Sequence, residues 1–276
     1  MTPAQVHCAA EAHAHDFDRW LAALFAPESR RGHVHALIAF NLELARIADQ
    51  VSQPLLGQMR LQWWREALEG IGEGRPRKHP VVLALAEAAA SCELPAASLL
   101  DMIDARELDV AGGPPETLAD LIVYGERTAG SLNELTARVL GVSERSGLAR
   151  ARRLGGVVAL LGLLRSHHHH AARGRVFLPR ELIEAQGLSA DRLRQEDHAS
   201  ALARMARLVA TEAGARLQDR ERADPRLLPV LLQGRLARLY LRRLAAADYD
   251  LANRRLVPSG PRRQLALLAG WLTRWY

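Results

Sequence analysis

A short acidic series between residues 101 and 109 is the first group that could do chemistry. Its members are Asp101, Asp104, Glu107 and Asp109. Carboxylates three or four residues apart share one face of a helix, and Mg²⁺ prefers such oxygen ligands. A solvated helix face would use the same residues, with its buried side formed by Leu99, Leu100, Ile103 and Val110. The residues alone leave both interpretations open.

Four consecutive histidines, His167 to His170, form the second group. Imidazole suits zinc or nickel, and His167 and His170 would lie on one helix face. Two ligands do not make a structural site, and no cysteine lies nearby to complete one. We therefore interpret the run as a polar helix end, with metal binding as the weaker alternative.

The elements that must position these groups are helices. Hydrophobic residues make up 49% of the chain and charged residues 25%. Leu, Ala, Arg and Glu dominate, whereas β-branched and aromatic residues are sparse, which favours helix over strand. Apolar periodicity and turn residues predict helices over 33–51, 58–71, 80–91, 96–110, 117–140, 144–169, 199–221, 225–248 and 262–276, with a short helix opened by Pro179.

These helices predict one all-α domain over residues 1–276. We expect about nine or ten helices around a central cavity, because no linker is long enough to divide domains and no internal repeat is visible. Residues 1–14 are expected to be a flexible N-terminus, and residues 262–276 a C-terminal helix. Thr117 is the predicted cap of the helix that Gly141 ends.

The charge balance is basic, with 37 Lys+Arg against 31 Asp+Glu and a formal charge of +6. Lys78 is the only lysine. Such a charge is compatible with an anionic membrane surface, a diphosphate ligand or nucleic acid, and also with a simple compositional bias towards arginine. No compact basic run has interleaved aromatic residues, so we do not expect nucleic-acid binding.

The cysteines and the apolar runs indicate where in the cell the protein is expected. Cys8 and Cys92 are far apart, which indicates a reducing compartment. The first twenty residues have neither an apolar core nor a basic character, so we expect a cytoplasmic protein of bacterial type. Leu154–Leu164 is too short to span a bilayer. Residues 265–276, with Trp271 and Trp275, could lie in a membrane interface or pack on the core.

Four segments occur in an order and spacing that resemble squalene and phytoene synthases. They are Ala36–Asp49 with the downstream Arg60–Leu68, then Ile103–Asp109, then Tyr124–Gly130, and finally Leu163–Pro179. The last is similar to the family's Leu-Arg-Asp-x-x-Glu-Asp-x-x-x-Gly-Arg-x-Tyr-Leu-Pro. Together they cover about residues 15 to 245, and their joint order is more specific than any single segment.

The resemblance implies an isoprenoid-synthase fold and a metal-dependent reaction. In the family, two acidic motifs on facing helices hold Mg²⁺ ions, which draw the diphosphate off a prenyl substrate. An apolar tunnel shelters the prenyl chain. The retained Asp109 matches an acid of the family, and Tyr124 matches a pocket tyrosine, although a core tyrosine with a satisfied hydroxyl is an equal alternative.

The acidic motifs themselves are largely lost. The first reads Ala45-Arg46-Ile47-Ala48-Asp49, so Asp49 is the one acid that remains. The second reads Arg165-Ser166-His167-His168-His169-His170 and has no acid. The surrounding frame persists, including Arg165, Gly174, Arg175 and Pro179. We expect a pocket kept without the ionisation step, and a cofactor only if the chain is an active enzyme, in which case it would be Mg²⁺.

One branch of the family shares these departures: the squalene/phytoene-synthase-like assembly factors of respiratory complex I. The matching phrases are Ala39–Ala45, Gly57–Trp63, Ile103–Glu107 and Arg175–Pro179. That branch is considered non-catalytic and acts at the membrane where complex I subunits are assembled. The resemblance implies the same role here, with complex I subunits as partners and peripheral contact with the membrane.

Two alternatives remain beside this hypothesis. One is an active prenyl transferase that condenses farnesyl or geranylgeranyl diphosphate head to head. The other is a metal-independent binder of a prenyl diphosphate or lipid head group, with arginines replacing the metal charge. The candidate pocket residues are Arg46, Asp49, Tyr124, Arg165 and Arg175, and the weak candidates for metal ligands are Asp49, His167 and His170.

Overall fold

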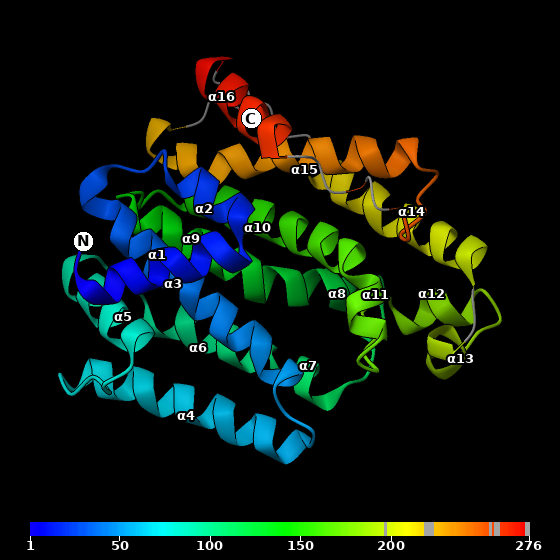
Figure 1. The fold of residues 1–276 in the computed structure, drawn as a ribbon, viewed down its shortest axis with the longest axis horizontal. Coiled ribbons are helices and arrows are strands. Elements are labelled where there is room, and N and C mark those ends of the chain that lie inside the picture. The colour runs from blue at the N-terminus through cyan, green and yellow to red at the C-terminus, as the bar shows by residue number, and fades with distance from the viewer. Residues whose placement is uncertain (196–197, 218–223, 254–255, 257–259, 274–276) are drawn as a thin grey trace.

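A computed structural model describes residues 1–195, 198–217, 224–253, 256 and 260–273. Helices make up its regular structure, and no strand is assigned within the described residues. Figure 1 shows them packed around a long central helix, α10 (Arg145–Arg165). The buried apolar side chains form one connected core that extends from the N-terminal helices to α16. This confirms the predicted all-α fold.

The N-terminal half consists of helices of mixed length. They are α1 (Pro3–His15), α2 (Phe17–Ala23), α3 (Glu28–Arg46), η1 (Ile47–Asp49), α4 (Pro54–Gly72), α5 (Pro80–Ser91), α6 (Ala96–Ala105), α7 (Glu107–Ala111), α8 (Leu118–Gly125), η2 (Glu126–Gly130) and α9 (Ser131–Val139). Of these, α8, η2 and α9 pack on α10. Thr117 caps α8 through its side chain, as predicted, and Gly141 ends the unit with a φ of 86°.

The C-terminal half supplies α10 itself and the helices that cover it. After α10 come α11 (His167–Ala171), α12 (Arg180–Glu184), α13 (Ala190–Gln195), α14 (Ala199–Arg216), η3 (Pro225–Leu227), α15 (Leu228–Ala246) and α16 (Gly260–Thr273). In Figure 1, α16 crosses the outside of α15 at one edge of the molecule, and α4 lies at the opposite edge. The predicted C-terminal helix is thus present, although residues 274–276 lie outside the described part.

The predicted helix count was wrong. In the described residues the helices run from α1 to α16, more than the nine or ten predicted, because several predicted long helices are divided. The predicted helix over 96–110 breaks at Arg106, and the one over 144–169 breaks at Ser166. Between α8 and α9 the backbone passes through a π-helical turn, Glu126–Gly130. Such turns widen a helix locally and often occur near functional sites.

The expectation of a flexible N-terminus was also wrong. Residues 3–15 form α1, whose start is stabilised by a capping box between Thr2 and Gln5. Cys8 and Ala12 are fully buried against α3 and α5. Burial raises the pKa of the Cys8 thiol to about 12, so it stays protonated at neutral pH. The small alanine side chains of this segment allow close helix packing. Because the segment lacks large apolar residues, its sequence shows no apolar stripe that would have predicted this packing.

Glycines allow α10 to approach the π-helical turn closely. A Cβ built on Gly155 would stand 2.1 Å from the carbonyl oxygen of Ala129 and 2.7 Å from the Cα of Gly130. A Cβ on Gly156 would stand 3.0 Å from the side chain of Glu126, a looser approach. The two helices therefore touch through their backbones, which fixes α8 and its Tyr124 relative to α10 and the histidine run that follows it.

Candidate functional site

Asp49, the surviving acid of the first motif, lies among cations. It stands at the end of η1 and accepts a hydrogen bond from Nη2 of Arg175. Nε of Arg173 lies 3.5 Å away, and Nε2 of His169 lies 3.6 Å from the other carboxylate oxygen. The two family motifs thus face each other in space, as the resemblance implies, but the second motif presents cations and imidazole to the remaining acid.

A second group of polar side chains lies close to this one and is almost completely buried. The hydroxyl of Tyr124 donates to Oδ1 of Asp109 at 2.6 Å. Nη1 of Arg106 donates to the Tyr124 oxygen at 2.8 Å and to Oδ2 of Asp109 at 3.0 Å. Its Nη2 donates to Oδ1 of Asn41 at 3.0 Å. The guanidinium of Arg106 therefore ties α3, α7 and α8 together from inside the bundle.

The surroundings of Tyr124 and Arg106 keep these two side chains protonated. Burial raises the pKa of the Tyr124 phenol well above its ordinary value, so the hydroxyl remains a donor. Burial alone would lower the pKa of Arg106, but Tyr124 and Asp109 outweigh it and raise that pKa. Asp109 consequently does not lie on a solvated face, and its carboxylate is occupied by Arg106 and Tyr124.

The histidine run divides into an inward and an exposed pair. His167 is buried and His170 half-buried, whereas His168 and His169 are exposed. Burial lowers the pKa of both His167 and His170 to about 4, helped at His170 by the charge of Arg175. The predicted pairing of the two on one helix face is therefore present. Neither contacts Asp49, whose imidazole neighbour is His169.

A small apolar gap adjoins His167 and His170. The room in it for a water-sized molecule is only about 10 Å³, enough for about one water, so no ligand pocket is open here. Its lining is Leu121, Leu160, Leu163, Leu164, His167, His170, Phe177, Leu178 and Val209. Phe177 links it to the polar groups, because its ring lies 4.8 Å from His170 and 5.7 Å from Tyr124 between centroids.

Two predicted pocket residues lie elsewhere. Arg46 donates to Glu11 at 2.8 Å and fastens α3 to α1. Arg165 lies at the other side of α10, where its guanidinium stacks over the ring of Tyr240 at 4.0 Å and pairs with Asp18 at 3.4 Å. The structure does not bring these two side chains to Asp49 and Arg175, because the helical turn directs each of them to a different neighbour.

The remaining acids of the 101–109 series do not converge on one point. Asp104 and Glu107 both pair with Arg65 of α4. Asp101 pairs with Arg127 and Arg152. Within the described part of the chain, no cluster of three or more His, Cys, Asp or Glu side chains is placed to hold a metal ion.

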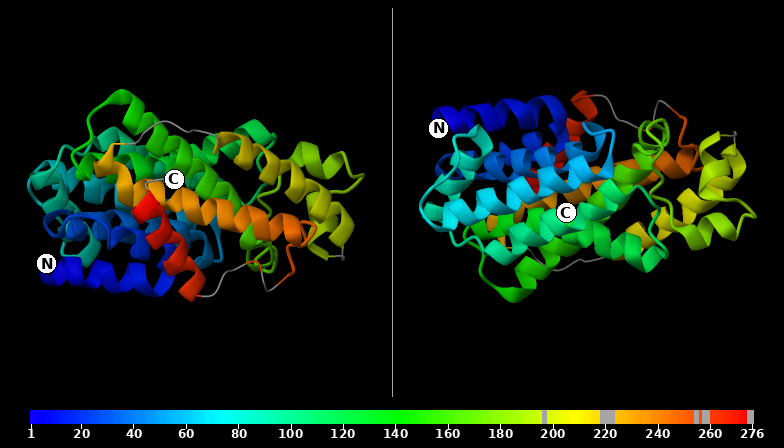
Figure 2. Two further views of the ribbon diagram at one scale, coloured as in Figure 1. Left: turned by 90° about the horizontal axis from the view of Figure 1, so that it is seen from above. Right: turned by 90° about the horizontal axis from the view of Figure 1, so that it is seen from below.

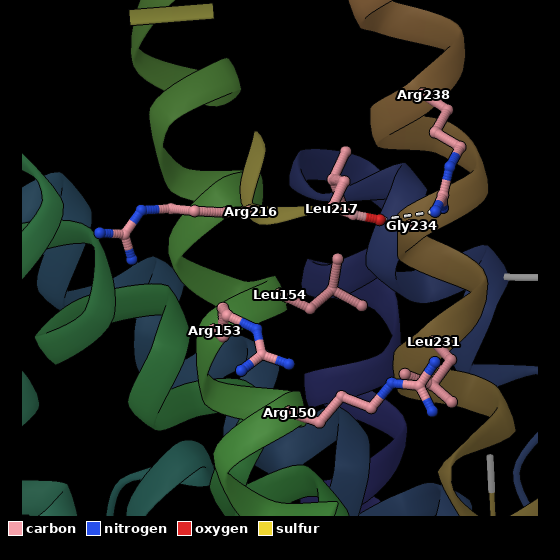
Figure 3. A pocket seen from close by; sticks show the side chains of 8 residues that line it. All are labelled: Arg150, Arg153, Leu154, Arg216, Leu217, Leu231, Gly234 and Arg238. Atoms are coloured by element: carbon pink, nitrogen blue, oxygen red, sulfur yellow. Dashed lines mark hydrogen bonds between the residues drawn. The ribbon is translucent and has the colours of Figure 1, made fainter. Parts of the chain in front are cut away.

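A second hollow lies on another face, between α10, α14 and α15 (Figure 3). Its room for water-sized molecules is about 30 Å³, and it is lined by Arg150, Arg153, Leu154, Arg216, Leu217, Leu231, Gly234 and Arg238. Arg216 pairs with Glu126 and Glu212. Arg238 donates to the carbonyl of Leu217 at 2.7 Å, the dashed contact in Figure 3. Arg216 and Arg238 therefore hold neighbouring helix ends together.

Sequence reasoning missed the residues that complete the site. Arg106 lies inside the motif Ile103–Asp109. It was missed because the acids around it were considered as the chemical groups of this segment. Asn41 sits within an apolar helix pattern, and a lone amide at such a position is a signal for a buried partner. Arg173, next to the retained Gly174 and Arg175, was not singled out from the sequence.

Comparison with known structures identifies the fold class. A crystal structure of a dehydrosqualene synthase in complex with a ligand superimposes with a TM-score of 0.82, at 20% sequence identity over 99% of this chain and 97% of that one. The architecture is that of the all-helical isoprenoid synthases. The sequence profile described as squalene/phytoene synthase matches residues 12–262. The chain belongs to the squalene/phytoene synthase family.

Relatives within the family include both assembly factors and enzymes. NADH dehydrogenase (ubiquinone) complex I, assembly factor 6, from Bos taurus is 30% identical over 240 residues, covering 86% of this chain and 72% of that protein. Phytoene synthase from Mycobacterium tuberculosis is 27% identical over 171 residues, covering 62% of this chain and 55% of that protein. The likeness to the assembly factor extends over more of the chain.

Proposed function

We propose that this chain is a non-catalytic member of the family that acts in the assembly of respiratory complex I at a membrane surface. The observation that carries the proposal is the ion pair between Asp49 and Arg175. It places a guanidinium beside the surviving acid of the first motif, where the active enzymes of the family bind metal. The likeness to complex I assembly factor 6 over most of the chain supports the role.

The side chains around Asp49 do not suit Mg²⁺. This ion needs several oxygen ligands in near-octahedral geometry, and the nearest groups are the cations Arg173 and Arg175 and the imidazole of His169. A metal would have to displace Arg175 from Asp49 while the second motif offers nitrogen in place of carboxylate. We therefore infer that no magnesium-dependent ionisation of a prenyl diphosphate takes place.

The first test is catalytic. The purified chain is incubated with labelled farnesyl and geranylgeranyl diphosphate, with and without Mg²⁺, and products and released diphosphate are measured. We expect no turnover under either condition. Release of diphosphate that requires Mg²⁺, together with a condensed hydrocarbon, would show a head-to-head prenyl transferase and would overturn the non-catalytic assignment. The likeness to phytoene synthase makes that alternative the one to exclude.

The second test addresses assembly in the organism that encodes the chain. Deletion of the gene should lower the amount of assembled complex I, measured by native gel and by NADH oxidation in isolated membranes. Wild-type protein should restore it, and an Asp49→Asn variant should restore it as well, since a metal ligand is not needed. Normal complex I in the deletion strain would contradict the assembly role.

A metal-independent anion site is the second candidate function. Arg106 and Arg175 both have a buried Nε without a hydrogen-bond partner among the described residues, and His170 has such an Nδ1. Guanidinium groups recognise phosphate well. This set replaces the sequence-based trio of Arg46, Arg165 and Arg175, of which only Arg175 lies at the site.

Binding of farnesyl diphosphate by calorimetry without Mg²⁺ tests this candidate. We expect Arg175→Gln to weaken binding at least tenfold, whereas Arg46→Gln, which alters only the pair with Glu11, should leave it unchanged. Equal affinity of the wild type and the Arg175 variant would exclude the anion site.

A further inference from the structure

The C-terminal helix α16 has an apolar face that the described residues leave largely exposed, with Trp271 alone lying near another ring, that of Phe25 at 6.5 Å. Leu265, Leu268, Trp271 and Leu272 are exposed by 63%, 45%, 47% and 66%. The three leucines follow a spacing of three and four residues, so they form one stripe along the helix. Scattered single exposed leucines need no explanation, but four large apolar residues on one short helix mark an interaction surface.

The opposite face fastens α16 to the body of the protein. Leu267 is fully buried, and Gly270 lies against Leu232 and Arg235. Arg263 donates to Asp18 at 3.1 Å and lies over the ring of Phe17 at 4.7 Å. The exposed stripe is therefore held outward on a supported helix. Figures 1 and 2 show α16 lying along the outside of the molecule, across α15.

The chemistry of α16 fits a lipid surface. The described helix has no acidic residue, and exposed Arg262 lies at one margin of the apolar stripe with Trp271 at the other. Arginine and tryptophan beside a leucine stripe are typical of helices that lie in the interface of an anionic membrane. The net charge of +6 adds attraction to anionic head groups.

The length of α16 fits lying on a membrane rather than crossing it. Its 14 residues span about 21 Å, less than the ~30 Å hydrocarbon core. Among the described helices, none is both long and apolar enough to cross a bilayer. We propose that α16 docks the protein onto an anionic lipid bilayer through Leu265, Leu268, Trp271 and Leu272. This deepens the membrane part of the proposed function.

Vesicle flotation with the full chain tests the proposal without involving complex I. The probes are vesicles of phosphatidylcholine alone and vesicles that also contain phosphatidylglycerol. We expect the wild type to float with the second kind. The triple variant Leu265→Gln, Leu268→Gln, Leu272→Gln should lose about tenfold or more in partitioning. The triple variant should unfold at the wild-type temperature, because all three side chains are exposed.

A matched control comes from α4 at the opposite edge of the molecule, where Leu55 and Met59 are also exposed. The variant Leu55→Gln, Met59→Gln should bind vesicles like the wild type. Equal loss in both variants, or wild-type binding by the α16 variant, would overturn the proposal. So would a wild type that floats with neither kind of vesicle. A lipid-free dimer that only the α16 variant dissociates would assign the face to a second copy instead.

Discussion

Asp49 accepts a hydrogen bond from Arg175, a residue 126 positions further along the chain. The pair joins the end of η1 to the segment after α11, across the place where the two family motifs meet. A guanidinium cannot be deprotonated in a protein, so the carboxylate has a permanent internal counter-ion. The charge of Asp49 is therefore balanced within the chain itself.

Replacing Arg175 should destabilise the fold. In Arg175→Met, Asp49 loses its main partner in a partly buried place, and we expect the free energy of unfolding to fall by about 2 kcal/mol. Arg173→Met is the control, because its side chain is 47% exposed against 8% for Arg175. Its loss should stay below about 1 kcal/mol. Urea unfolding measures both, and equal losses would contradict the central role of Arg175.

The hydroxyl of Tyr124 should matter through Asp109. Tyr124→Phe leaves a carboxylate oxygen and Arg106 each short of a partner, so stability should fall by about 1–3 kcal/mol. Tyr249→Phe is the control, since its ring stays beside Arg207 at 5.0 Å. Its effect should lie within about 0.5 kcal/mol.

A double-mutant cycle with Asp109→Asn completes this measurement. Because Tyr124, Asp109 and Arg106 share one network, the two substitutions should be non-additive by at least about 0.5 kcal/mol. Strict additivity would show that the hydrogen bond of 2.6 Å does not couple the two side chains.

Stability should fall on mild acidification. Burial lowers the pKa of His35 to about 4, and its two ring nitrogens have no partner among the described residues. A depressed histidine pKa favours the native state above the unfolded pKa of about 6.5, and this contribution is lost as the pH falls towards 4. At pH 5 the loss from one such histidine is about 2 kcal/mol relative to pH 8.

The pH dependence can be assigned by substitution. His35→Leu removes one titrating group from an apolar place and should flatten the stability curve between pH 8 and pH 5. Replacing exposed His168 by Ala should leave the slope unchanged. A curve in His35→Leu as steep as in the wild type would assign the acid sensitivity to other groups, of which His167 and His170 come first because their pKa values are also lowered.

Two glycines of α10 should respond in opposite ways to alanine. Gly155→Ala would place a methyl 2.1 Å from the Ala129 carbonyl oxygen, so we expect a loss of about 3 kcal/mol or more, or failure to fold. At Gly162 no atom lies within 4 Å of the added Cβ. Gly162→Ala should therefore stabilise the protein by about 0.5–1 kcal/mol through higher helix propensity. Thermal melts separate the two, and equal effects would argue against the close helix contact.

The fold could be predicted from the sequence because its signals are local. The start of α5 at Pro80, the Thr117 cap and the stop at Gly141 each follow from one or two residues. Helix α1 was missed for the opposite reason. Its buried residues are Gln5, Cys8 and Ala12, a face too small to stand out as an apolar stripe.

The site could be predicted only in outline. The order of motifs placed Asp49 opposite the histidine run, and the structure brings Asp49 and His169 to 3.6 Å. The partners of each arginine depend on side-chain direction at helix ends, which a sequence pattern does not specify. Arg46 and Arg165 therefore pair with Glu11 and Asp18, while Arg173 takes a place beside Asp49.

The arginines around Asp49 also bear on how this lineage can evolve. A single mutation that restored a carboxylate at His169 or His170 would place it near Arg173 or Arg175, which would pair with it in competition with a metal. Return to a metal site would need several changes at once on segments far apart in the chain. Because Arg173 and Arg175 would pair with a restored acid, the loss of the acidic motifs is hard to reverse.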